Sequence, residues 1–343
     1  MLPIKVADGV DPLYARGLEE ELRTQLARVG RMEVTSSESA RQLFEQGLSA
    51  DEICRRLGAD FAWVGALEIG ADRVTLSARL IEAVTKNEAF SDELSSSPSA
   101  AQSLPLRTAR AITTALGRPV SERRAAASVS ASDFRLYLTA LGLIKTRGDE
   151  QRRAALDILV QITQRNPDFA DGWAGLAKAW FLLPVDDKDA MKTNRARADQ
   201  VARKALEIDP ETVDALKILG MLDTIEPQQR LAYLKRATQL DPGDPEAWFW
   251  RSMTQEEFAL QAGDPVSSAA KVVDIDPLWP ASWLSSGLAA TFGRIEDARS
   301  FEESIALAAV TPSQRLLAEA RLAQINGDLS RFVTLTREAQ PTQ

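Results

Sequence analysis

Apolar residues follow two different spacings along this chain, and the change from one to the other divides it. In the first third, segments that alternate or run apolar predict strands at Leu2–Val6, Met32–Thr35, Phe61–Leu67, Arg73–Ile81 and Glu88–Leu94. Beyond about residue 131 the alternation disappears. Apolar residues there recur three and four positions apart, which predicts helices alone.

Two of the predicted strands have the clearest patterns. In Phe61–Leu67 both the odd- and the even-numbered positions are mostly apolar, so we expect a central strand with both faces buried. Arg73–Ile81 alternates between apolar and polar residues, which predicts a strand with one face in water. The residues between them, Gly70 to Asp72, are expected to form a hairpin turn.

Helices are expected among these strands. One begins after Asp11, with Pro12 at its first position and leucines one turn apart at 18, 22 and 26. The next two are Ser37–Gln46 and Asp51–Leu57, and Pro105 opens a further helix. These segments predict a small sheet flanked by helices.

The segment Arg118–Ala131 is rich in small and charged residues and has no apolar periodicity, which predicts a linker. It separates an α/β domain, residues 1–118, from a helical domain, residues 132–343, with the linker over 119–131. A change from mixed to purely helical periodicity is typical of a domain boundary.

Asn-Pro and Asp-Pro dipeptides end several predicted helices of the second domain. The residues before proline are Asn166, Asp209, Asp241 and Asp276, at intervals of 43, 32 and 35 residues. Proline disfavours helical backbone in the residue before it. A period near 34 residues is typical of tetratricopeptide (TPR) helix pairs.

Counting back from each proline gives five helix pairs and a weaker sixth that would cap the array. The expected helices are Phe134–Lys145 with Gln151–Gln164, Ala170–Leu182 with Asn194–Ile208, Val213–Asp223 with Gln228–Leu240, Pro245–Phe258 with Val266–Ile275, Pro280–Thr291 with Ile295–Ala309, and Arg315–Ile325 with Leu329–Ala339. The predicted fold class is α+β followed by all-α: a small mixed α/β domain, then a right-handed TPR solenoid.

Four residues test this assignment of positions within the repeats, which we call the register. Trp173 and Trp283 take the position that packs inside a repeat, so both are expected in the core. Gly220 and Gly287 are expected where a neighbouring helix approaches too closely for a side chain.

The first helices of successive pairs line the inner groove of a TPR solenoid, and the register places a set of side chains there. Phe249, Trp250 and Met253 fall within one and a half turns, an aromatic and methionine cluster that suits an apolar helix or an extended peptide. Packing between repeats is the alternative for this cluster. The candidate partner-binding residues are Lys178, Lys217, Met221, Phe249, Trp250, Met253, Leu284 and Leu288.

Composition and charge exclude several classes of function. The 343 residues have a net charge of −8, without the basic excess that nonspecific nucleic-acid binding requires. The absence of histidine excludes serine–histidine nucleophiles and histidine metal sites. No phosphate-binding glycine loop or dinucleotide fingerprint is present, so no catalytic residue, metal site or cofactor is predicted.

Three further features complete this picture. The acidic run Glu19–Glu21 is expected on a solvated helix face. Cys54, the one cysteine, is expected to be a half-buried structural thiol, and it rules out an intrachain disulfide. No apolar run is long enough to span a membrane.

The first domain also resembles a known family. The sequence from Asp11 to Leu22, the Arg31–Val34 stretch, Ile53–Gly65 and Arg73–Ala83 are similar to amino-terminal domains of the TolB type. Such domains often precede TPR repeats in membrane-anchored bacterial transcription regulators and nucleotide cyclases. The resemblance implies the periplasmic region of an inner-membrane protein, with a cytoplasmic location as the alternative.

Two functional hypotheses follow. The first is a noncatalytic sensory or protein-interaction region of a bacterial signalling or transcription-regulatory protein, with a protein or peptide partner in the groove. The second is a scaffold that self-associates, for example as a homodimer, without a regulatory effector. An enzyme is not expected, because no nucleophile–base set is apparent in the sequence.

Overall fold

The computed structural model describes residues 1–339 apart from 8, 36, 121–128, 147, 186 and 258–262. It divides into two compact units. Unit 1 comprises Met1–Glu33, Trp63–Ile81 and Asn87–Pro242, and unit 2 comprises Val34–Ala62, Glu82–Lys86 and Gly243–Gln343. Each unit therefore combines part of the strand-bearing first third with part of the helical region. Most of the predicted linker lies outside the described residues, so the predicted domain limits stay a prediction.

The sheet has the order β1-β2-β3-β4. Its strands are β1 (Lys5–Val6), β2 (Phe61–Ile69), β3 (Val74–Glu82) and β4 (Glu88–Ser96). β1 pairs in parallel with β2, and β3 pairs antiparallel with β4. The internal position of β2 confirms the central strand predicted from its apolar run.

The turn between β2 and β3 and the first strands were also predicted. The Gly70 N–H donates to the Arg73 carbonyl over 2.8 Å, which confirms the hairpin turn. The strand predicted at Leu2–Val6 is shorter: the ladder with β2 comprises Lys5 and Val6, and the Leu2 N–H donates to the Trp63 carbonyl over 3.0 Å. The strand predicted at Met32–Thr35 is wrong: the segment forms no ladder, and its alternation is too short to fix a partner.

Helices form in the first third where the sequence predicted them. They are α1 (Pro12–Gly30), α2 (Ser37–Glu45), α3 (Ala50–Leu57) and α4 (Leu104–Ala115), and the 3₁₀ turn η1 (Pro98–Ser103) was not predicted. The Asp11 carboxylate caps α1 by accepting the Leu13 N–H over 2.9 Å. Cys54 on α3 is buried and not half-buried as expected.

The helical region is a run of consecutive helix pairs, as the sequence predicted. Its helices are α5 (Ala131–Thr146), α6 (Asp149–Arg165), α7 (Ala170–Leu182), α8 (Lys188–Ile208), α9 (Val213–Met221), α10 (Pro227–Leu240), α11 (Pro245–Glu257), α12 (Pro265–Ile275), α13 (Ser282–Thr291), α14 (Ile295–Ala308), α15 (Pro312–Ile325) and α16 (Leu329–Ala339). The predicted helices match these to within a few residues, except that α8 begins six residues before the predicted Asn194.

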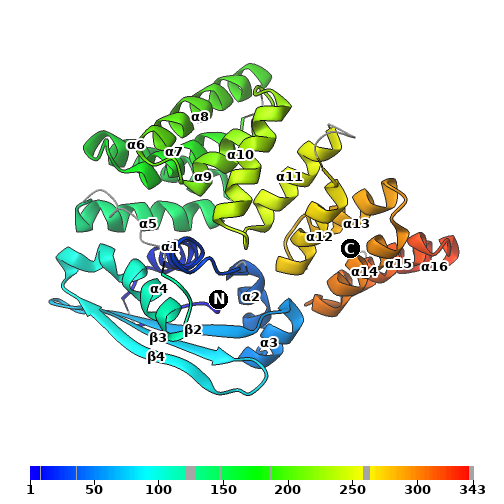
Figure 1. Cartoon of the computed structure of the whole chain (residues 1–343), viewed down its shortest axis with the longest axis horizontal. Helices are drawn as coiled ribbons and strands as arrows, with labels where there is room; N and C mark the ends of the chain where they lie inside the picture. The colour runs from blue at the N-terminus through cyan, green and yellow to red at the C-terminus, as the bar shows by residue number, and fades with distance from the viewer. Residues whose placement is uncertain are drawn as a thin grey trace. The chain divides into compact units, whose positions relative to one another are not determined.

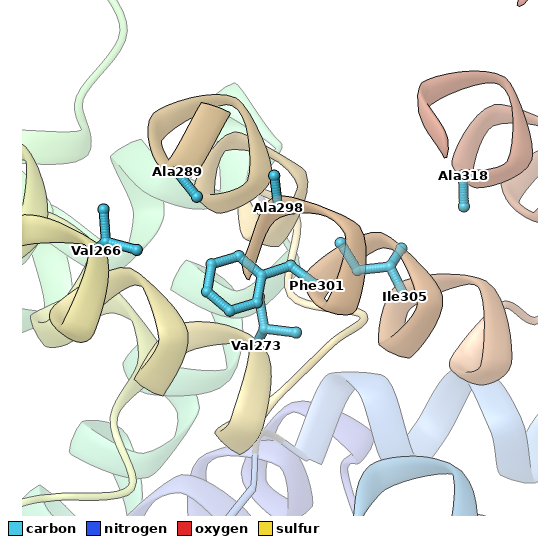
Figure 2. Packing of buried hydrophobic residues seen from close by; sticks show 7 residues of the cluster. All are labelled: Val266, Val273, Ala289, Ala298, Phe301, Ile305 and Ala318. Atoms are coloured by element: carbon cyan, nitrogen blue, oxygen red, sulfur yellow. The ribbon is translucent and has the colours of Figure 1, made fainter. Parts of the chain in front are cut away.

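Within unit 2, small and branched residues fill the spaces between α12, α13, α14 and α15. Figure 2 shows the Phe301 ring of α14 beside Val273 of α12, with Ala298 and Ile305 on the same helix as Phe301. Burying a large side chain of this kind stabilises the fold by roughly 1.5–3 kcal/mol. These contacts join consecutive repeats, as expected for a solenoid.

The two glycines chosen from the sequence behave differently. A Cβ at Gly220 would lie 2.4 Å from Leu234 Cγ, so the close approach predicted there is confirmed. A Cβ at Gly287 would have no heavy atom within 4 Å, so the same prediction for Gly287 is wrong. Gly287 lies on an exposed face of α13, where a side chain would meet solvent.

Among the described residues, no helix combines the length and the apolar character needed to cross a membrane.

Candidate protein-interaction surface

The predicted groove residues are divided between the two units. Lys178, Lys217 and Met221 belong to unit 1, and all three are buried. The others belong to unit 2, where the candidates fall into two groups by exposure: Phe249 and Leu288 are buried, and Trp250, Met253 and Leu284 are half-buried. The role of the eight in partner binding stays a prediction.

In unit 1, helix α1 of the sheet layer lies directly against the first repeat helix, α5. Figure 1 shows α1 between the sheet and α5. The backbones approach so closely that a Cβ at Gly17 would lie 1.8 Å from the Leu138 carbonyl oxygen. A Cβ at Gly142 would lie 2.1 Å from the Leu13 carbonyl oxygen. Each helix therefore provides a glycine where the other helix needs space.

Ion pairs then tie α1 to three successive repeats. Arg28 donates two hydrogen bonds to Asp171 on α7, at 2.8 and 3.2 Å. Arg23 donates to Asp241, which follows α10, over 2.8 Å. Lys145 on α5 lies 2.9 Å from Glu20. Paired guanidinium and carboxylate groups of this geometry are strong and specific contacts.

The two lysines predicted for the groove take part in the same polar surface. The ammonium groups of Lys178 and Lys217 lie 3.5 and 3.3 Å from one oxygen of Asp214. Burial acts to raise the pKa of Asp214, but these two ammonium groups outweigh it and hold that pKa well below its ordinary value. The lysines are therefore held inside unit 1 beside α1, not exposed for an external ligand.

The acids of α1 have opposite electrostatic environments. Burial acts to raise the pKa of Glu20, but Lys145 and Arg23 lower it well below its usual range. Burial and the nearby Asp171 raise the pKa of Glu21 to about 7, although Gln25 donates to it. The expectation that Glu19–Glu21 face solvent is wrong, because both sides of α1 are covered.

A small cavity remains at this contact. It has a volume of about 10 Å³ and is lined by side chains of α1, α5, α7 and α9, including Arg28 and Tyr137. The buried Nε of Arg28 has no hydrogen-bond partner within the described chain. A polar space of this size suits one water molecule and leaves no room for a larger ligand.

In unit 2, helix α2 contacts the repeats through a different pair. The Ser39 hydroxyl donates to Asp276 over 2.7 Å, and both residues are buried. Burial raises the pKa of Asp276 to about 7, although Ser39 and two backbone N–H groups donate to its carboxylate. Arg56 on α3 donates to the Ala309 carbonyl over 3.1 Å, which adds a second contact to the repeats.

The fifth helix pair has a polar centre that the register did not predict. The Glu302 carboxylate on α14 is fully buried, accepts a hydrogen bond from Ser286 on α13 and pairs with Arg321 at 2.7 Å. Trp283 is 48% exposed, so the expectation that it is a core residue is wrong. Trp173, at the equivalent position of the second pair, is half-buried and donates to the Pro167 carbonyl over 2.9 Å.

The helical periodicity did not show that α1 covers the inner surface of unit 1. The available signals were Gly17 inside a helix and the charged residues on the face opposite its leucines. The structure describes no group of three or more acidic, cysteine or histidine side chains that could hold a metal ion, within the residues it covers.

Comparisons with known proteins give structural likeness only. No family model matches the chain, and no curated protein matches it. PilF of Pseudomonas aeruginosa is 18% identical over 60% of this chain and 90% of its own, with a TM-score of 0.46. PilW, described as a type IV pilus biogenesis factor, is 16% identical over 62% of this chain and 94% of its own, with a TM-score of 0.45.

A third structure is YrrB, described as a TPR protein with an unusual peptide-binding site. It is 18% identical over 60% of this chain and 92% of its own, with a TM-score of 0.36. No residue role in this chain is taken from these proteins.

Proposed function

We propose that this chain is a noncatalytic protein-interaction scaffold, and that the inner surface of the repeats in unit 2 receives an amphipathic helix of a protein partner. The observation that supports this proposal is the position of α1 in unit 1. There the first helices of successive pairs already hold a helix. In the same register, unit 2 has the apolar residues Phe249 and Met253 at the positions of Lys217 and Lys178 in unit 1. Glu246 keeps an acidic residue at the position of Asp214.

The chemistry of the unit 2 surface defines its partner. Met253 and Leu284 are half-buried on the first helices of consecutive pairs, and Trp250 lies one turn from Met253. Methionine adapts its shape to different apolar ligands, and tryptophan adds a large contact area. An apolar helix face is therefore a better match than a charged segment.

The finer hypothesis places this scaffold in a bacterial signalling or transcription-regulatory protein. It is supported by the resemblance of the first domain to the TolB type. In that context the helix of the partner would carry the signal to or from the repeats. A self-assembling scaffold is the alternative, with a second copy as the partner.

The test is site-specific photo-crosslinking of the full chain in cells, with the photoreactive residue at Met253 or at Leu284. Both positions are expected to crosslink to the same protein, and mass spectrometry should map the adduct to a helical segment. Leu307, which is 68% exposed on α14, is the matched control and should give no such adduct. The purified partner should then bind the full chain and lose affinity for Trp250→Ala/Met253→Ala.

Two outcomes would contradict the proposal. Equal crosslinking at Leu307 would mean that the adducts report exposure alone. Adducts only between copies of this chain, together with a dimer by light scattering, would favour the self-assembling scaffold.

A further inference from the structure

Helix α1 has two opposite faces of different chemistry. Leu18, Leu22 and Leu26 lie one turn apart on one face and are buried. Gly17, Glu20 and Arg28 lie on the opposite side, from which α1 contacts α5 and α7. One helix therefore serves both the sheet layer and the repeats, through different surfaces.

These two surfaces differ in how readily they can separate. The leucine face is apolar, so exposing its three buried side chains to water is strongly unfavourable. The face toward the repeats holds ion pairs and glycine contacts besides the buried Tyr14 ring, which lies under the Arg135 guanidinium of α5. Separated ions regain their hydration, which lowers the cost of opening this face. The sheet layer with α1 can thus leave the repeats without losing its own core.

We infer that α1 is a removable cover, and that the inner surface of α5, α7 and α9 beneath it is a second, latent binding site for a partner's helix. This site differs from the unit 2 surface proposed above and does not depend on it. Its ligand is defined by the contacts that α1 now makes. The ligand helix must present a small residue to Leu138, an acid to Lys145 and an arginine to Asp171.

The spacing of the ligand follows from α1 itself. A glycine, then glutamate three positions later, then arginines six and eleven positions after the glycine reproduce Gly17, Glu20, Arg23 and Arg28. A larger residue in place of the glycine would collide with the Leu138 carbonyl oxygen. A charged pattern with an obligatory glycine distinguishes this ligand from the apolar helix expected in unit 2.

The test uses the full chain and a fluorescent peptide with the sequence of α1, Pro12–Gly30, measured by fluorescence anisotropy. In the Arg28→Asp chain, the new carboxylate faces Asp171 and should drive α1 away. The peptide, which keeps its arginine, should then bind at least about 10-fold more tightly than to the unsubstituted chain, because the covered state no longer competes.

Charge reversal provides the matched controls. The chain with Arg28→Asp and Asp171→Arg together should close again and lose the added affinity. A peptide with Gly17→Ala should bind the Arg28→Asp chain at least about 10-fold more weakly than the parent peptide.

Three results would overturn the inference. One is an Arg28→Asp chain that keeps its circular dichroism but does not bind the peptide. Another is binding that survives Gly17→Ala in the peptide, which would indicate nonspecific attraction. The third is a loss of helical signal from the whole of the Arg28→Asp chain, which would show that α1 and the repeats form one inseparable core.

Discussion

Asp241 in unit 1 and Asp276 in unit 2 occupy the same position of successive repeats, and each contacts a helix from the first third of the chain. Asp241 accepts from the Arg23 guanidinium on α1, which carries a positive charge. Asp276 accepts from the Ser39 hydroxyl on α2 and from backbone N–H groups, all of which are neutral. The same repeat position can therefore support a charged contact or a neutral one.

The difference has a physical consequence. Burial without a compensating charge favours the protonated form of a carboxylic acid. The pKa of Asp276 is accordingly raised by burial to about 7, despite its hydrogen bonds. The contact of Asp241 in unit 1 is stabilised by opposite charges. The contribution of Asp276 to the stability of unit 2 changes with pH, because this carboxyl group titrates near neutrality.

The largest expected effect comes from breaking the charged contact of unit 1. Arg28→Met would leave the half-buried carboxylate of Asp171 without its partner, at a cost of at most about 3–5 kcal/mol in the free energy of unfolding. Urea denaturation measures this cost. Arg203→Met on α8, whose pair with Asp199 is largely exposed, is the control and should cost less than about 1 kcal/mol. Similar losses in the two variants would contradict the special role of the α1 contact.

The neutral contact of unit 2 should reveal itself through pH. The folded chain holds the Asp276 proton more tightly than the unfolded chain, since burial raises its folded pKa to about 7. This group's contribution to stability is therefore complete at low pH and is lost as the pH rises from about 4 to about 7. The loss amounts to at most about 4 kcal/mol.

Asp276→Asn should remove that share of the pH dependence. The measurement is the free energy of unfolding in urea at a series of pH values, with the variant compared to the unsubstituted chain at each pH. A constant difference between the two chains from pH 4 to pH 8 would show that Asp276 does not titrate in this range. Glu21→Gln provides a parallel series for unit 1, where burial raises the pKa of Glu21 to about 7.

Gly17 in unit 1 and Gly287 in unit 2 differ in the space available for a side chain. Gly17→Ala places a Cβ 1.8 Å from the Leu138 carbonyl oxygen, so the backbones must move apart, at a cost of about 1–3 kcal/mol. Gly287→Ala meets no atom within 4 Å and should stabilise its helix by about 0.5–1 kcal/mol. Thermal melting of both variants measures the opposite signs, and destabilisation by Gly287→Ala would indicate a contact that the structure does not show.

The smallest effects are expected at the two equivalent tryptophans. Trp173→Phe removes the hydrogen bond to the Pro167 carbonyl and should cost about 1 kcal/mol. Trp283 is 48% exposed, so Trp283→Phe should change stability by less than about 0.5 kcal/mol. Urea denaturation of both variants measures these losses in the free energy of unfolding. A larger loss for Trp283→Phe would indicate that Trp283 is a core residue after all.

Local patterns predicted the elements well. The Asn-Pro and Asp-Pro dipeptides correctly predicted where repeat helices end, since proline disfavours helical backbone in the residue before it. The double apolar alternation of Phe61–Leu67 marked the internal strand. The isolated segment Met32–Thr35 failed, because four alternating residues do not determine whether a neighbouring strand is available.

The arrangement of the inner surface could not be predicted in the same way. The register correctly placed Lys178 and Lys217 on the first helices of their pairs, but it did not show that α1 would cover them. That contact joins residues more than a hundred positions apart, such as Arg28 and Asp171. Periodicity describes which face a residue occupies, and it contains no information on which distant helix meets that face.

The single thiol of the chain has a practical value. Cys54 is buried on α3 within unit 2, and burial raises the pKa of its thiol. A thiol reagent attacks the thiolate, so the native protein should react slowly, at a rate set by transient opening of unit 2 around α3. Because this cysteine is unique in the sequence, every adduct reports that one location. The reaction rate of Cys54 therefore measures how often unit 2 opens locally around α3, and no engineered label is required.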